Sequence, residues 1–81
     1  MSGQTSDIVV TMHFDPMIGI VDLQERIDDL SREAASRGFG FDRHGARNEL
    51  HAATFRLPGM SIIRLAASPG GAIAIEARPA S

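Results

Sequence analysis

The sequence predicts a two-layer α+β domain, in which one long helix packs on a mainly antiparallel sheet of four to five strands, in the chain order β-α-β-β-β-β. Three observations support this fold class: a single amphipathic stretch at residues 20–37, segments of alternating apolar residues on both sides of it, and proline–glycine pairs between the later segments. A chain of 81 residues is long enough for one such domain with one thin hydrophobic core. We place this domain at residues 7–78.

The first strand is predicted at residues 7–14, because apolar side chains recur there at every second position. Its more apolar side consists of Ile8, Val10, Met12 and Phe14. Residues 1–6 are small and polar, and we expect them to form a disordered N-terminal tail.

The long helix is predicted over residues 20–37, because its apolar residues recur at steps of three and four and therefore share one face. These residues are Ile20, Leu23, Ile27, Leu30 and Ala34. Gly38 follows directly and suits the left-handed C′ position at which many helices end. Two starts are open: Asp15 as the N-cap with Pro16 at the first helical position, or a turn over residues 15–19 with Gly19 at the cap.

Further strands are predicted after the helix, at residues 39–43, 49–57, 60–67 and 72–77. Pro58-Gly59 and the segment 68–71 provide proline–glycine turns, so the last three strands should form an antiparallel meander. Residues 79–81 are expected to form a C-terminal tail.

The strand at 60–67 is apolar on both sides. One side carries Met60, Ile62 and Ala66, and the other carries Ile63, Leu65 and Ala67. A single helix covers only one face of a sheet, so the second apolar face needs cover from another chain. We therefore predict an interface at Ile63, Leu65 and Ala67, covered by a second protomer in a homodimer or by a larger protein.

Composition argues against several classes of partner. A net charge of −2 and a pI near 5.8 give no basic surface for nucleic acid or acidic lipid. The absence of cysteine rules out disulfides and thiolate metal sites. The sequence shows neither a secretory signal nor an apolar run near the roughly 20 residues that cross a bilayer. We therefore expect a soluble cytoplasmic protein without nucleic-acid or membrane partners.

The candidate ligand-binding residues are His13, Asp15, Arg43, His44 and His51. His13 and Asp15 lie two positions apart on a predicted strand, so their side chains can point the same way. Together with His44 or His51 they form the kind of imidazole–carboxylate set that binds a divalent ion or transfers a proton. Their spacing matches no established zinc motif, so we predict no metal, no cofactor and no catalytic residue.

The first strand and the helix also resemble one known family. Asp15-Pro16 after a strand, followed by a helix with Leu23, Ile27 and Leu30, is similar to the opening of an amino-acid-binding ACT domain. ACT domains are built β-α-β-β-α-β, which implies a second helix and a ligand-sensing role. No helical stripe is evident after Gly38, so we assign the chain to no family.

The predicted function is a non-enzymatic protein-interaction module, acting as a homodimer or as an accessory or inhibitory subunit of a larger protein. The motivation is the strand that is apolar on both sides, combined with the absence of any convergent polar motif. An enzyme is the less favoured interpretation. The alternative is a small-molecule-binding or isomerase-like domain with its site between helix and sheet, near the three histidines.

Overall fold

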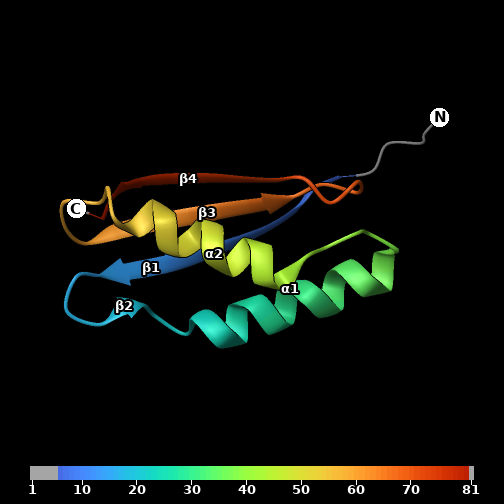
Figure 1. Ribbon diagram of the computed structural model, residues 1–81, viewed down its shortest axis with the longest axis horizontal. Helices are drawn as coiled ribbons and strands as arrows, with labels where there is room; N and C mark the ends of the chain where they lie inside the picture. Colours follow the sequence, from blue (N-terminus) through green and yellow to red (C-terminus); the bar gives the residue numbers. More distant parts are fainter. Residues whose placement is uncertain (1–5, 81) are drawn as a thin grey trace.

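The computed structural model describes residues 6–80, which form an antiparallel sheet with two helices on one of its faces (Figure 1). The elements are β1 (Ile8–Asp15), β2 (Gly19–Ile20), α1 (Leu23–Arg37), α2 (Arg43–Thr54), β3 (Ser61–Ala67) and β4 (Ile73–Pro79). The strand order in the sheet is β2-β1-β3-β4. The predicted α+β class and antiparallel sheet are therefore confirmed, with four strands, whereas the single helix and the five-strand chain order β-α-β-β-β-β are not.

The segment between β1 and α1 is a turn followed by a second short strand, rather than the beginning of the helix. The backbone N–H of Ile18 donates to the Asp15 carbonyl at 3.0 Å, and the Asp15 carboxylate accepts from the Met17 N–H at 2.8 Å. Gly19 has φ 101° and pairs with Asp15 as the first residue of β2. Of the two predicted starts, the turn over residues 15–19 is found, but Gly19 is not the cap: Asp22 is the N-cap, and α1 begins at Leu23, three residues later than predicted.

The predicted long helix is otherwise confirmed as α1, which buries Ile27, Leu30 and Ala34 against the sheet. It ends as predicted at Gly38, which has φ 74°. The following N–H, of Phe39, donates to the Ala34 carbonyl at 2.8 Å. Glycine adopts this left-handed conformation without a Cβ clash, so the helix stop follows from the local sequence.

The predicted strands at 39–43 and 49–57 are wrong: residues 39–42 form a connection without regular structure, and most of 49–57 belongs to α2. The Asp42 carboxylate accepts a hydrogen bond from the Gly45 N–H at 3.1 Å and so caps the helix. Ala46 and Leu50 are buried and Ala53 is half-buried, which gives a stripe at helical spacing. The stripe consists mostly of small residues, and the alternation at 51–57 fits a strand equally well.

The two C-terminal strands are confirmed as β3 and β4, joined by a hairpin at residues 68–71. The Gly71 N–H donates to the Ser68 carbonyl at 3.0 Å, and Gly71 itself has φ 100°. A Cβ added at Gly71 would lie 3.0 Å from the Gly40 carbonyl oxygen. Glycine is therefore required at this position for both conformation and space. Pro58-Gly59 connects α2 to β3 instead of joining two strands.

The hydrophobic core lies between the sheet and the two helices. Its members are Ile8, Met12, Phe14, Ile27, Leu30, Ala34, Phe39, Ala46, Leu50, Ile63, Leu65 and Ala67. The predicted interface at Ile63, Leu65 and Ala67 is therefore wrong, since each of these residues has 0% of its surface exposed. Their face of the sheet is covered by α1 and α2 of the same chain, and α2 is the element that the sequence analysis missed.

Residues 1–5 and 81 lie outside the described residues, and with them most of the two predicted tails at 1–6 and 79–81. At the C-terminal end, β4 includes Pro79, and the Ala80 N–H donates to the Met60 carbonyl at 3.0 Å. The sheet thus extends past the predicted domain end at residue 78. Neither helix of residues 6–80 has the length and apolar character needed to cross a bilayer.

Candidate functional site

The face of the sheet opposite the helices is uncovered, and we call it the open face. It consists of Val9, Thr11, His13, Ile62, Arg64, Ala66, Ala74, Glu76 and Arg78, which alternate with the core residues along β1, β3 and β4. All nine side chains are exposed or half-buried. Side chains of successive strand residues point to opposite faces, so the open face is fixed once Ile63 and Leu65 point inward.

The strand register arranges the open face in rows that run across the sheet. Val9, Ala66 and Ala74 form an apolar row, and Val9 has 42% of its surface exposed. The next row contains Arg64 opposite Glu76, with a guanidinium–carboxylate distance of 3.5 Å. This pair is exposed on both sides, so it contributes little to stability.

The third row places Ile62 between His13 and Arg78. Arg78 makes no salt bridge with any residue between 6 and 80. It lines a shallow hollow of about 320 Å³ on the open face, together with Thr11, Ile62 and Glu76. A guanidinium that pairs with no carboxylate in this described part of the chain, beside apolar surface, is suited to bind a carboxylate from another molecule.

A second exposed surface, which we call the apolar end, lies where β1 ends and β3 begins. It consists of Met17, Ile18, Val21, Phe55 and Met60. Met17 and Phe55 have 91% and 87% of their surfaces exposed. The pairing of Phe14 with Ser61 places the hairpin after β1 beside the loop before β3, and both lie at the left of Figure 1. Grouped apolar residues of this size are typical of a contact surface.

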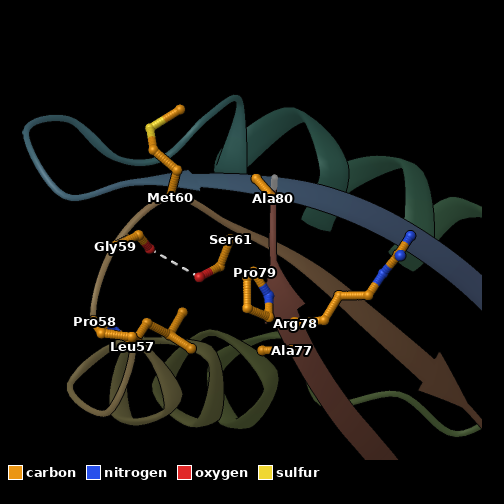
Figure 2. A pocket seen from close by; sticks show the side chains of 9 residues that line it. All are labelled: Leu57, Pro58, Gly59, Met60, Ser61, Ala77, Arg78, Pro79 and Ala80. Carbon is orange, nitrogen blue, oxygen red and sulfur yellow. Dashed lines mark hydrogen bonds between the residues drawn. The ribbon is translucent and has the colours of Figure 1, made fainter.

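A hollow of about 680 Å³ adjoins the apolar end, between the loop 57–61 and the chain end 77–80 (Figure 2). Its floor is ordered by the Ser61 hydroxyl, which donates to the Gly59 carbonyl at 2.8 Å. Arg78 lines this hollow as well as the one on the open face. Figure 2 shows the Arg78 side chain extending away from Leu57 and Pro58, so the two hollows are joined by this residue.

The structure does not bring the predicted ligand-binding residues together. His13 is exposed on the open face, whereas His44 and His51 are exposed on α2, in the layer on the other side of the sheet. Asp15 caps the turn after β1, and Arg43 forms a salt bridge with Asp28 of α1. Within residues 6–80, no group of three His, Asp or Glu side chains is placed to hold a metal ion.

The sequence patterns do not single out most of the residues that form the exposed surfaces. They predict that Ile62 and Ala66 lie on the side of their strand that the helix covers. They also predict a strand at Phe55, which in the structure follows α2 as its C-cap and is almost fully exposed. The alternation of side chains along β3 shows which residues share a face. It identifies the exposed face only once α2 is known to be a second helix on the other face.

Comparisons with known proteins find similarity at the level of fold. Neither a protein-family model nor a curated protein sequence matches this chain. A crystal structure described as a "Putative amino-acid aminotransferase" from Mesorhizobium loti has the same fold, with a TM-score of 0.87 and 22% sequence identity. The match covers 95% of this chain and 37% of that chain. The present chain thus spans little more than a third of the length of the protein that it resembles.

Proposed function

We propose that this chain is a non-enzymatic interaction module that packs as an accessory unit on a larger folded protein. The observation that carries the proposal is the one-sided sheet: α1 and α2 cover one face, and the opposite face presents an apolar row and Arg78, which makes no salt bridge with a residue between 6 and 80. An antiparallel sheet often leaves its second face in contact with water, whereas exposed apolar residues on that face favour packing on a further layer.

The contact surface in this proposal is continuous from the open face to the apolar end. Val9, Ile62 and Ala66 supply flat apolar area, and Met17 and Ile18 project from the hairpin beside it. Long flexible methionine side chains adapt to an opposing surface, which suits a contact of this kind. Arg78 lies between the two regions and would pair with a carboxylate of the larger protein.

The structural comparison favours a particular kind of larger unit. In the Mesorhizobium loti protein this fold accounts for 37% of a longer chain, so most of that protein lies outside it. We propose that the present module similarly accompanies a second folded unit, and that the assembly is of the amino-acid aminotransferase kind. The module then supplies a packing surface, while the chemistry belongs to the second unit. Fold likeness alone supports this part, because one fold serves many functions.

A photo-reactive amino acid tests the contact surface directly. It is placed at Thr11 on the open face and, as a matched control, at Ser36 on the exposed side of α1. On illumination in the native cells, the Thr11 position should give one adduct of defined mass, and the Ser36 position should give none. The adduct should disappear when Ile62→Glu is added. Equal labelling from both positions, or none from Thr11, would contradict the proposal.

The cytoplasm remains the proposed location, on the basis of the sequence features alone, and cell fractionation checks it. The ligand site near the histidines is not proposed further, because the sheet separates His13 from His44 and His51.

A further inference from the structure

The strand β4 forms one edge of the sheet, and its outer backbone groups have no partner in residues 6–80. It pairs only with β3. A hydrogen bond lies at each end of this ladder: the Ser68 N–H donates to the Ala72 carbonyl at 2.9 Å, and the Ala80 N–H donates to the Met60 carbonyl at 3.0 Å. In an antiparallel ladder, hydrogen-bonded pairs alternate with pairs that are not hydrogen-bonded. Because Ala72 and Ala80 are both bonded, the even-numbered residues of β4 bond to β3. The backbone groups that point outward therefore belong to Ile73, Ile75, Ala77 and Pro79, and Pro79 lacks an N–H.

The core-facing side of β4 is only partly covered. Ile73 and Ile75 are half-buried and Ala77 is exposed, whereas Ile63 and Leu65 on the neighbouring β3 are completely buried. Two hollows of about 270 and 380 Å³ follow the seam between α2 and β4. The helical layer thus stops short of the sheet edge, and one further layer of side chains would complete the core there.

The opposite edge of the sheet does not share these features. It is formed by β2, which has two residues, so it offers little backbone for pairing. β4 has seven residues and carries neither a bulge nor an inward charge, two of the means by which edges are blocked, and its charged residues Glu76 and Arg78 point to the open face. Only Pro79, at its last position, interrupts the row of donors.

We propose that β4 pairs antiparallel with β4 of a second copy of this chain, about a two-fold axis through Ile75. In this register Ile75 faces its own counterpart and Ile73 faces Ala77 of the partner subunit, so all three outward N–H groups on each copy find a carbonyl. A register one residue further along would place Glu76 opposite Glu76 of the partner subunit, which is unfavourable. In the proposed register Glu76 faces Ala74 instead.

Charge complementarity favours a second copy over another strand. Glu49 and Arg56 line the hollow between α2 and β4, at its two ends, and neither forms a salt bridge with a residue between 6 and 80. α2 and β4 run in the same direction (Figure 1), so a two-fold axis reverses both in the second copy. The Glu49 end of one copy then meets the Arg56 end of the other, twice per dimer.

The proposed association stops at two copies. The joined sheet has β2 at both of its edges, and these strands are too short to recruit further copies. The pairing uses neither the open face nor the apolar end, so it is independent of the accessory role proposed above and can fail separately from it.

Disulfide trapping tests the register, because the natural chain contains no cysteine. Ala74→Cys and Glu76→Cys replace exposed residues that face each other across the proposed axis. An oxidised mixture of the two variants should give a covalent heterodimer. Either variant alone should stay monomeric on a denaturing gel, because two Cα atoms beyond about 7 Å cannot be bridged. Ala35→Cys, on the exposed side of α1, measures random oxidation. Efficient cross-linking of Glu76→Cys alone, or a mixture that links no better than Ala35→Cys, would overturn the proposal.

Sedimentation equilibrium tests the pairing without a cross-link. The natural chain should dimerise within about 1 to 100 µM, and Ala77→Pro should raise its dissociation constant by at least about tenfold, since two donors per dimer are lost. Ala77→Ser retains the N–H and should change little. Circular dichroism checks that both variants are folded, which is expected because the Ala77 N–H points away from β3 and bonds to no residue between 6 and 80.

The paired charges provide a third variant that does not touch the backbone. Glu49→Arg should weaken dimerisation several-fold, and the double change Glu49→Arg with Arg56→Glu should restore it. A natural chain that stays monomeric through this range, or a dimer that tolerates both Ala77→Pro and Glu49→Arg, would show that β4 remains bare or serves a different partner.

Discussion

The two faces of the sheet differ most in burial along β3, although they are formed by alternating residues of the same strand. On β3, Ile63 and Leu65 are fully buried beneath the helices, whereas Ile62 and Arg64 between and beside them point to the open face. Ile62 and Ile63 are the same residue type in consecutive positions. The difference between them is therefore set by which face the helices cover, rather than by side-chain chemistry.

Apolar residues on the inner face and on the open face of the sheet differ in what can bury them. The inner residues are covered by α1 and α2, so their contribution to stability is internal to the chain. The outer residues are only partly buried in the single chain, and burial of their remaining surface would stabilise only an assembly. Substitutions in consecutive positions can therefore separate folding from association.

Truncation of a core side chain should give the largest change in the free energy of unfolding, and it tests whether the two faces differ. Leu65→Ala removes a side chain with no exposed surface and should lower the free energy of unfolding by about 2–5 kcal/mol. Ile62→Ala on the open face should cost about 1 kcal/mol or less in the isolated chain. Urea denaturation monitored by circular dichroism measures both. Equal losses would mean that the two faces are not distinguished as described.

The β3–β4 hairpin holds both faces in register, and Gly71 is its most constrained position. Gly71→Ala should destabilise by about 1–3 kcal/mol, because it combines a positive φ with close approach to the Gly40 carbonyl. Gly70→Ala is the matched control, since a Cβ there meets nothing within 4 Å. Thermal unfolding of the two variants should separate clearly. A Gly70→Ala variant as unstable as Gly71→Ala would argue against this hairpin geometry.

Substitutions at the helix caps weaken the helices that cover the inner face and leave the sheet itself unchanged. Asp42→Ala removes the side-chain bond to the Gly45 N–H and should cost about 0.5–2 kcal/mol. Asn48→Ala, at an exposed position within α2, removes no hydrogen bond seen among residues 6–80 and should cost less. Amide hydrogen exchange should show faster exchange in α2 for Asp42→Ala. If amide exchange in α2 were as slow in Asp42→Ala as in the natural chain, the Asp42 side chain would not stabilise the start of α2.

The smallest effect is expected on the open face itself. Arg64 and Glu76 form an exposed pair at 3.5 Å, and a double-mutant cycle with alanine should give a coupling of about 1 kcal/mol or less. The coupling should fall further at high salt, because exposed charges are screened. A coupling of several kcal/mol would mean that this part of the sheet is covered in the isolated chain.

Much of the fold could be predicted from the sequence, because its signals are local. The alternation at 7–14, the helical stripe ending at Gly38 and the Ser68 to Gly71 turn each fix one element. α2 could not be predicted in the same way, since Ala46 and Ala53 give a weak stripe and residues 51–57 also alternate. Missing α2 reversed the assignment of covered and open faces, so the interface was placed on Ile63, Leu65 and Ala67 instead of around Ile62.

The candidate site was less predictable than the fold. The three histidines are separated by the layer structure, and no spacing in the sequence reports on which side of the sheet a helix residue lies. Arg78 becomes notable only in the structure, where the register places it beside Ile62 and His13 and no described carboxylate pairs with it. Long-range register, rather than local pattern, determines such neighbours.

Thiol labelling at two consecutive positions tests the central claim most directly. Ile62→Cys and Ile63→Cys are prepared separately in the cysteine-free chain, and their rates of reaction with a small thiol reagent are compared. The isolated protein should react rapidly at Ile62→Cys and only slowly, through unfolding, at Ile63→Cys, and in the native cell extract the Ile62→Cys thiol should become protected. Equal rates at the two positions, or an Ile62→Cys thiol that reacts as fast in the extract as in isolation, would contradict a sheet with one face covered by its own helices and the other reserved for another protein.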